Sequence, residues 1–398
     1  MTVETLPPPR LSVGPVAWLR ANLFASLPSS LSTGLLLGLI IVLGINVTSW
    51  ATTEARWEVV TGNARLLLIG QYPADQAWRV WLSLAILSAL TGMSAGVFGR
   101  TTRTLAISLS ACQLLLAALL AVSPVGPLIV AGLLANAAGV WVGFVLGRRG
   151  LVPRRALVVA WVLSMPASFL LLSGVAASGP LPSVSSNLWG GLLLTILIAA
   201  VGIVLSFPLG VLLALGRRSS LPAVRLLSTG YIELVRGVPL VTILFMADIM
   251  LPLFLPGEVR LDRVARAMGA ITLFSAAYLA ENVRGGLQAI PSGQIEAAQA
   301  LGLNGVQTNL HIVLPQALRA VIPANVGLFI SLLKDTTLVT IIGLFELLGI
   351  ARAVLAQPES LGATMEIFVF IAVVFFVLCY AMSQASYRLE RALGVGTR

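Results

Sequence analysis

A few charged and hydroxyl-bearing residues stand inside or at the ends of long apolar runs in the second half of the chain. They are Glu233, Arg236, Lys334, Asp335, Thr336 and Thr337. Ionisable side chains at membrane depth are costly, so they either hold helices together as ion pairs or line a path for a polar ligand. Arg236 follows Glu233 at the spacing of an intrahelical ion pair, and Lys334 could pair with a carboxylate on a neighbouring helix. Both interpretations stay open at this point.

A second unusual stretch, Glu296 to Pro315 (EAAQALGLNGVQTNLHIVLP), lies between two strongly apolar runs. It is too polar and too rich in glycine to cross a bilayer, and it is too short to be a domain. We expect a short helix from about Gln294 that Gly302 ends in a left-handed conformation. A second short helix from Gly305 is expected to stop before Pro315.

The first of these short helices has the features of a docking element. Ser292 or Gly293 can cap it, and Glu296 falls in its first turn, where a carboxylate favours the helix dipole. Alanines at 297, 298 and 300 keep it slim enough to enter a groove on another protein, with Ile295 and Leu301 as apolar contacts. Such a contact would transmit motion between two bodies.

Composition predicts the class of protein that must position these residues. Hydrophobic residues make up 58% of the 398 residues and charged residues 10%, and apolar runs of about 18 or more recur, as in a polytopic helical membrane protein. The first run, Leu31 to Val47, is long for a signal-peptide core, so we expect a retained span. Cys112 and Cys379 fall in separate spans and predict neither a disulfide nor a metal site.

The net charge of +10 is explained by topology. Arginines cluster at short turns, and if these turns are cytoplasmic, ten spans thread alternately with both termini inside. The expected spans are at about residues 31–49, 81–99, 104–122, 126–146, 156–176, 189–215, 229–255, 266–284, 321–345 and 363–385. Sixteen basic residues are then cytoplasmic and seven external. This bias follows the positive-inside rule and makes a nucleic-acid partner unnecessary.

The chain is expected to divide near residue 180. Residues 1–180 form an extension with about five spans, which carry almost no charge and so face lipid or pack. The segment at 174–187, GVAASGPLPSVSSN, is small, polar and broken by prolines, as an external linker would be. Residues 181–398 contain the polar features, with a cytoplasmic loop at about 285–320.

The spacing of seven residues in the polar loop carries a family resemblance. The spacing is Glu-Ala-Ala, three residues, Gly, nine residues, Ile, one residue, Leu-Pro, and the residues are Glu296, Ala297, Ala298, Gly302, Ile312, Leu314 and Pro315. It resembles the EAA signature of inner-membrane permease subunits of ATP-binding-cassette (ABC) importers. The blocks YIELVRGVPL, LAENVRGGLQAIPSGQIEAAQALG and LLKDTTLVTIIG are similar to the polar amino-acid uptake branch. The long N-terminal half resembles subunits of general L-amino-acid systems.

The resemblance implies a fold, a location and partners. It implies an all-α protein of the bacterial inner (plasma) membrane, with a C-terminal five-helix core of the type I importer kind, that forms the path of an ATP-driven amino-acid uptake system. The polar loop would dock on a dimer of ATPase subunits. A second permease subunit, more often a different chain, would complete a heterodimer, and an external, periplasmic amino-acid-binding protein would deliver the substrate.

The ATPase site is expected on the partner chain. This sequence has no G-x-x-x-x-G-K-[ST] loop, and its single lysine follows leucines. We therefore expect no cofactor on this chain, with ATP and Mg²⁺ bound by the partner. An ATPase-coupled signalling or scaffold subunit that transports nothing is the alternative function. An ion-coupled carrier would need two related halves, which this sequence lacks.

In an amino-acid path, every substrate presents an α-carboxylate and an α-ammonium group. Arg236 or Lys334 would take the carboxylate and Asp335 the ammonium, with the interpretation that these charges hold the bundle together as the alternative. His311, the only histidine, is expected at a surface or interface. The segment EVRLDRVAR (258–266) is expected to be a solvated external turn, or else a contact for the binding protein.

Overall fold

The structure is a computed structural model that describes residues 14–121, 126–176, 179, 181–256 and 261–394. Contacts divide it into two compact units, Met1–Arg56 and Trp57–Arg398. The described part of the first unit contains α1 (Pro15–Asn22), α2 (Leu27–Ser49) and a π-helical turn, Trp50–Glu54. The hydroxyl of Ser26 caps α2 by accepting a hydrogen bond from the Ser29 N–H.

In the described residues of the second unit, the regular elements are all helices, and the β-bridges are isolated pairs. Its longer helices are α5 (Trp78–Phe98), α6 (Arg100–Leu120), α7 (Gly126–Arg148), α8 (Arg154–Ser173), α9 (Gly191–Arg217), α10 (Pro222–Gly237), α13 (Arg263–Gln288), α17 (Ile322–Asp335) and α19 (Thr364–Leu393). Its shorter α-helices are α3 (Glu58–Gly62), α4 (Ala64–Ile69), α11 (Leu240–Phe245), α12 (Leu251–Phe254), α14 (Ser292–Ala300), α15 (Gly305–Gln307), α16 (Leu314–Ala320) and α18 (Leu347–Leu355). Single 3₁₀ or π turns are at Ala74–Gln76, Ser186–Leu188, Met246–Met250, Thr308–Val313, Thr336–Ile342 and Pro358–Ser360.

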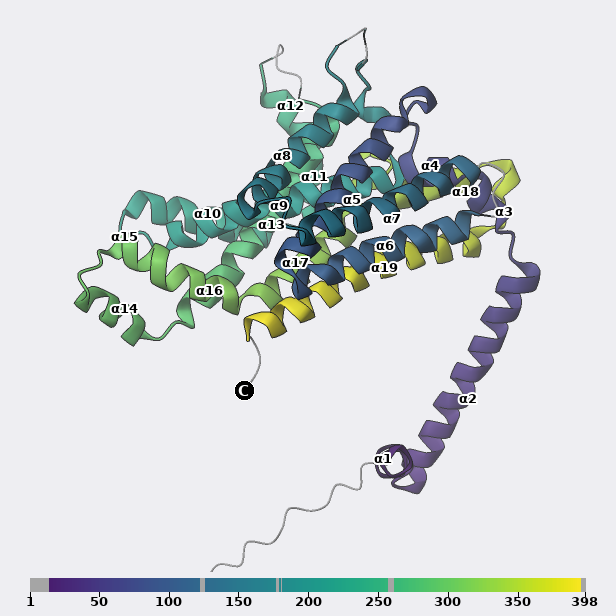
Figure 1. The fold of residues 1–398 in the computed structure, drawn as a ribbon, viewed down its shortest axis with the longest axis horizontal. Helices are drawn as coiled ribbons and strands as arrows, with labels where there is room; N and C mark the ends of the chain where they lie inside the picture. The colour runs from purple at the N-terminus through teal and green to yellow at the C-terminus, as the bar shows by residue number, and fades with distance from the viewer. Residues whose placement is uncertain (1–13, 122–125, 177–178, 180, 257–260, 395–398) are drawn as a thin grey trace, which may run out of the picture. The chain divides into compact units, whose positions relative to one another are not determined.

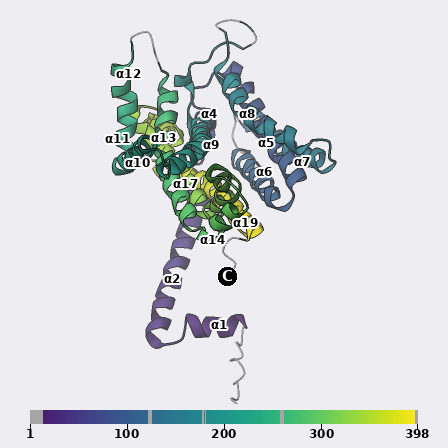
Figure 2. The ribbon, with the colours of Figure 1, turned by 90° about the vertical axis from the view of Figure 1, so that its left-hand side faces the viewer.

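Most of the short helices, together with α10, gather at two ends of this unit, whereas α11 and α12 lie between these ends (Figure 1). Helices α10, α14, α15 and α16 lie at one end, and α3, α4 and α18 lie at the opposite end. In Figure 2, α5 to α8 form one group, and α9 separates them from α10 to α13.

The predicted membrane architecture is confirmed. Within the residues that the structure describes, seven helical stretches are long and apolar enough to cross a bilayer: Leu27–Glu54, Ala74–Phe98, Ile129–Arg148, Arg154–Ser173, Gly191–Arg217, Ile322–Ile342 and Thr364–Arg391. The bent pair formed by α10 and the Leu240–Phe254 segment is a further candidate, and Thr102–Ala118 is a shorter apolar helix. Helix α13 matches the remaining predicted span but has charged residues near both of its ends. The protein is therefore an all-α polytopic membrane protein with about ten spans.

One predicted span is not straight. The segments Pro222–Gly237 and Leu240–Phe254 meet at 107°, so a continuous helix at 229–255 is wrong. The break follows from Pro239, which lacks the N–H that a helix needs. A proline also pushes the preceding residue out of the helical region, and Val238 is extended, with φ −112° and ψ 136°.

The helices α5 and α7 of the extension approach closely because small residues recur at four-residue spacing on both. A Cβ atom on Gly92 would lie 1.9 Å from the Val140 carbonyl oxygen, and one on Gly147 would lie 2.4 Å from that of Met93. Small residues let helix backbones meet in lipid, where close packing drives association. These spans are therefore a packed helical layer.

Glycines also join the extension to the second half of the chain. Gly70 forms an antiparallel bridge with Trp189, and a Cβ atom on Gly70 would lie 2.5 Å from the Gly190 Cα atom. Gly191, with φ +59°, donates its N–H to the Phe345 carbonyl at 2.9 Å. Residues 57–398 form one compact unit, so the expected division near residue 180 does not separate two packed bodies. That an importer core begins near residue 181 stays a prediction.

Candidate functional site

The helices α14 to α16 form a short hairpin that is anchored to two long spans. Val313 and Ala317 are buried in one cluster with Ala214 of α9 and Val283 of α13. The Gln316 side chain donates a hydrogen bond to Gln294 Oε1 at 3.3 Å, which ties α16 to α14. The hairpin is therefore fixed to the ends of α9 and α13, so a force on the hairpin reaches these spans.

The first helix of the hairpin begins earlier than expected. Helix α14 starts at Ser292 with Pro291 as N-cap and has no side-chain cap. The predicted start near Gln294, with Ser292 or Gly293 as the cap, is therefore wrong, and Glu296 lies beyond the first turn. Proline can hold this end of a helix because its backbone angle is fixed and its missing N–H would be unpaired there in any case.

The end of α14 is as predicted. Gly302 has φ +80°, a left-handed conformation that glycine adopts without a steric penalty. The Gly302 N–H donates to the Gln299 carbonyl at 2.9 Å, and the Leu303 N–H donates to that of Ala298 at 3.1 Å. These bonds close the helix as a left-handed cap does. No atom lies within 4 Å of a Cβ placed on Gly302.

The second short helix does not stop before Pro315. The Asn304 side chain and Gln307 form a capping box at the start of α15, and the π-helical turn Thr308–Val313 leads directly into α16. Hydrogen bonding changes from the wide π turn to the α-helical pattern at Leu314, so Pro315 becomes a first-turn residue. A proline is tolerated there because its missing N–H is not needed.

The outer surface of the hairpin presents apolar side chains to solvent. Leu301 is 83% exposed, Val306 67% and Leu310 51%. Ile295, expected to contact a partner, packs instead against the cluster that contains Val313. Val306 and Leu310 were missed in the sequence, although two apolar residues in a polar loop are a usable signal.

The seven signature residues divide between the surface and the interior. Ala298 is buried, Ile312 and Leu314 are half-buried, and four are exposed: Glu296, Ala297, Gly302 and Pro315. The exposed residues are available to another protein, and the others hold the hairpin in shape. His311 is also exposed, and its Nδ1 atom lies 3.0 Å from the Gln307 carbonyl oxygen.

An ion-pair network lies beside the hairpin and links three helices. Glu281 of α13 contacts Arg284, Arg217 of α9 at 3.3 Å and Arg236 of α10 at 3.5 Å. Arg217 also contacts Glu233 at 3.0 Å. Three guanidinium groups and two carboxylates leave one positive charge in excess. The network fixes α10 across the ends of α9 and α13.

The pairing of Arg236 differs from the intrahelical alternative. Arg236 contacts Glu281 and lies over the Tyr278 ring, 5.5 Å from its centroid, whereas Glu233 contacts Arg217. The expected Arg236–Glu233 pair is therefore replaced by contacts between helices. Helix packing causes this change of partner, because α13 brings Glu281 and Tyr278 next to Arg236 of α10.

Two charged residues of α17 lack such partners. Lys334 is exposed and Asp335 is half-buried, and neither forms an ion pair with any residue that the structure describes. The carboxylate expected to pair with Lys334 is thus not found in this part of the chain. Thr336 is fully buried and donates to the Leu333 carbonyl at 2.7 Å, and Thr337 donates to that of Lys334 at 2.8 Å.

Glu346 is a buried carboxylate that the sequence analysis missed. It lies beyond Ile342, where the preceding span ends, and it caps α18 by accepting from the N–H groups of Leu348 and Gly349 at 2.9 Å. The Thr340 hydroxyl donates to it at 2.7 Å. Burial raises the pKa of this carboxyl, against the opposing effect of its hydrogen bonds. Glutamate is not among the residues that are preferred as N-caps, so the sequence carried no capping signal at this position.

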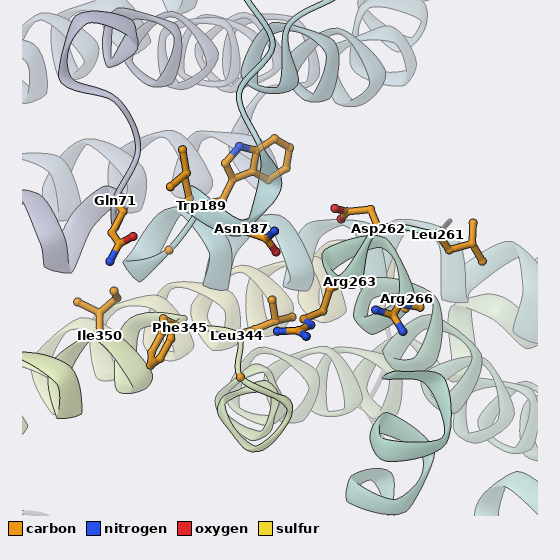
Figure 3. A pocket seen from close by; sticks show the side chains of 13 residues that line it. Gln71, Asn187, Trp189, Leu261, Asp262, Arg263, Arg266, Leu344, Phe345 and Ile350 are labelled. Carbon is orange, nitrogen blue, oxygen red and sulfur yellow. The ribbon is translucent and has the colours of Figure 1, made fainter. Parts of the chain in front are cut away.

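A polar cavity of about 630 Å³ lies between four connecting segments (Figure 3). Gln71 and the stretch 187–190 form one wall, and residues 343–345 with Ile350 form the opposite wall. The start of α13 contributes three charged residues, Asp262, Arg263 and Arg266. In the described part of the segment expected as a solvated turn, 261–266, four residues are exposed, Arg266 is half-buried and Val264 is buried.

The charges at this cavity are held by specific contacts. Asp248 contacts Arg263 Nε at 3.3 Å and Arg266 Nη2 at 3.2 Å, and Arg266 also donates to the Asp248 carbonyl. Asp262 caps α13 by accepting from the Val264 and Ala265 N–H groups, and it accepts from Ser186. The side chain of Arg263 is 45% exposed, whereas those of Arg266 and Asp248 are 11% and 12% exposed.

These features define a class. The structure combines a bundle of membrane-spanning helices, an exposed and anchored hairpin, an ion-pair network that joins α9, α10 and α13, and charged residues inside a span, which are the parts that a membrane transport subunit needs. It has a surface through which another protein could drive it. The broken span between α10 and α11 provides a joint near the same network.

Comparison with known proteins gives the family. The family model of the binding-protein-dependent transport system inner membrane component matches residues 206–395. The chain is 36% identical to the inner membrane amino-acid ABC transporter permease protein YhdY of Escherichia coli (strain K12), over 96% of this chain and 94% of the relative. It is 38% identical to the glutamate/glutamine/aspartate/asparagine transport system permease protein BztC of Rhodobacter capsulatus, over 97% and 95%.

A shorter relative matches about half of the chain. The probable glutamine ABC transporter permease protein GlnP of Bacillus subtilis (strain 168) is 39% identical over 51% of this chain and 92% of its own length. The chain belongs to the family of binding-protein-dependent transport system inner membrane components, and it is a multi-pass inner-membrane permease of the ABC importer type.

Proposed function

We propose that this chain is a permease subunit of an ATP-driven amino-acid importer. It forms part of the translocation path and couples that path to a separate ATPase. Two relatives that match it over nearly its whole length are named as amino-acid permeases. That similarity favours transport over the alternative of a signalling or scaffold subunit. The chain itself does not hydrolyse ATP, and ATP and Mg²⁺ bind to the partner.

The observation that carries the coupling role is the exposed hairpin. Its first helix, which contains the start of the EAA signature, is followed by a left-handed Gly302, and apolar Leu301, Val306 and Leu310 face outward beside it. A slim helix with exposed apolar residues suits a groove on another protein. We assign Glu296, Ala297, Ala298, Gly302, Ile312, Leu314 and Pro315 to ATPase coupling, with the first helix as the docking element.

The proposed topology places this hairpin and both termini in the bacterial cytoplasm. The arginine distribution supports that direction. The opposite face, which contains the polar cavity, then receives substrate from a periplasmic binding protein. A second permease subunit, more often a different chain, completes the path.

For the substrate path we assign the charged groups at membrane depth. Lys334 and Asp335 have no ion-pair partner in the part of the chain that the structure describes, which leaves them available to a ligand or to the second subunit. Thr336 and Thr337 follow as hydroxyl groups, and Arg236 with Glu233 belongs to the network at the hairpin. Arg236 shares Glu281 with two other arginines, so a substrate carboxylate could replace one of these contacts.

Reconstitution tests the proposal. The complex of this chain with its ATPase, second permease and binding protein is placed in vesicles, and ATP-dependent uptake of labelled acidic, neutral and basic amino acids is measured. We expect uptake that disappears without ATP or without this chain. ATPase activity in the complex without uptake of any amino acid would contradict the proposal and favour the signalling alternative.

A further inference from the structure

The polar cavity is built from connections that the arginine distribution places outside. They are the segment before α5, the linker before α9, the start of α13 and the turn before α18, and each contributes a wall residue: Gln71, Asn187, Arg263 and Leu344. These segments are far apart in the sequence, and the fold brings them to one place. The backbone contacts of Gly70 with Gly190 and of Gly191 with Phe345 hold the two walls together.

Of the two described arginines that line the cavity, Arg263 has the more exposed guanidinium group. Asp262 accepts from Val264, Ala265 and Ser186 and so has both oxygens occupied. Arg266 is only 11% exposed and is bound to Asp248. Arg263 contacts Asp248 through Nε at 3.3 Å. Among the residues that the structure describes, none forms a hydrogen bond with its Nη1 or Nη2 atom, and its side chain is 45% exposed.

The guanidinium group of Arg263 lines the cavity. Figure 3 shows its guanidinium group beside Leu344, with Asn187 opposite and the Asp262 carboxylate on the Asn187 side. The Nη1 atom lies 3.5 Å from where a Cβ on Gly343 would be, so the group rests on the turn that forms one wall. Because Arg263 contacts Asp248 through Nε, its Nη1 and Nη2 groups can bind a ligand together. We call this pair of terminal nitrogens the fork.

The chemistry of this fork selects a carboxylate. Two parallel N–H groups of a guanidinium bind the two oxygens of one carboxylate. A single open cation suits a singly charged group better than a phosphate, which usually recruits several cations. The exposed amides of Gln71 and Asn187 can accept from an ammonium group or bond to a polar side chain. A volume of about 630 Å³ lies within the range of small-molecule sites.

We propose that this cavity is an external vestibule that binds the α-carboxylate of the transported amino acid through Arg263, before the substrate enters the spans. The proposal rests on the amino-acid transport function and its topology. Because only the α-carboxylate meets the arginine, the vestibule serves amino acids with different side chains. Gln71 comes from the N-terminal extension, so the extension completes this site.

A protection experiment tests binding directly. In the complete complex, Asn187→Cys is labelled from outside with an impermeant thiol reagent. The native Cys112 and Cys379 lie in spans α6 and α19. L-Alanine and L-lysine should each slow the labelling, whereas ethylamine and cadaverine, which lack the α-carboxylate, should not. Adding Arg263→Gln should abolish the protection. Equal protection by the amines, or protection that survives Arg263→Gln, would overturn the vestibule.

Uptake separates this proposal from the general function. At saturating loaded binding protein, Arg263→Gln should slow uptake about tenfold or more, and Arg263→Lys should recover part of the loss because it restores the charge without the fork. Arg352→Gln, which removes an exposed arginine from α18, is the matched control and should transport normally. Asp248 keeps Arg266 as a partner in the Arg263 variants, so the fold is expected to persist.

The outcomes distinguish the two claims. Two results would refute the vestibule proposal and leave the transport function intact. In the first, the native complex imports amino acids, but substrate does not slow the labelling of the Asn187→Cys variant. In the second, the Arg263→Gln variant transports as fast as the Arg352→Gln variant. If the native complex imports no amino acid, the proposed function fails and the vestibule fails with it.

Discussion

The left-handed turn at Gly302 offers the sharpest test of the coupling role. Its φ of +80° is unfavourable for any residue with a Cβ atom, and the left-handed conformation costs such a residue about 1–2 kcal/mol. No atom lies within 4 Å of the added Cβ, so the free subunit adds no clash to that strain. A cost of this size lowers the population of the turn about 5- to 30-fold.

Two substitutions divide the effect into strain and contact. Gly302→Ala introduces the strain alone and should weaken ATPase association about fivefold or more. Gly302→Asp adds a charge, and aspartate tolerates the left-handed region better than alanine. Gly302→Asp should nevertheless be the more damaging change if the turn is enclosed by a partner, because a carboxylate would then be desolvated. Insertion and thermal stability of the subunit should stay close to those of the native chain.

Gly293 supplies the matched control. It lies in the first turn of α14 without a positive φ, and a Cβ atom there also meets nothing within 4 Å. Gly293→Ala and Gly293→Asp should leave coupling near normal. Co-purification of the ATPase and ATP-driven uptake are measured for all four variants at equal expression. If Gly302→Asp behaves like Gly293→Asp, the turn is not part of the docked surface.

Three further predictions concern the ion pairs, the substrate path and the topology. Glu281→Gln leaves three arginines with Glu233 as the remaining carboxylate and should lower the stability of the subunit by about 2 kcal/mol. Glu233→Gln removes a carboxylate whose side chain is 63% exposed and should cost less than about 1 kcal/mol. Equal changes in melting temperature for the two variants would show that Glu281 is not the centre of the network. Asp335→Asn should weaken transport of every α-amino acid alike by about 2–4 kcal/mol with assembly intact, and an effect on one side-chain class would exclude a common ammonium site. A thiol reagent added outside intact cells should label Ala74→Cys and spare Ser220→Cys, both exposed positions, and the reverse pattern would invert the topology.

The sequence by itself determined the class of protein, the spans and the hairpin. These features are local, because a run of apolar residues needs lipid wherever it occurs and a glycine after a short helix permits the left-handed turn without help from distant residues. The EAA spacing identified the family before any contact was known. Local patterns failed where two signals competed, as at Pro239, which breaks an apolar run, and at Pro315, which a preceding π turn accommodates.

Tertiary structure decided which charges meet. Glu233 and Arg236 have the spacing of a pair, yet Arg236 contacts Glu281, because a helix from another part of the chain lies closer to its guanidinium group. The burial of Glu346 and the open fork of Arg263 likewise depend on walls that come from distant segments. Spacing along one helix fixes only its own neighbours, whereas the partner of a long charged side chain is fixed by the packing of several helices.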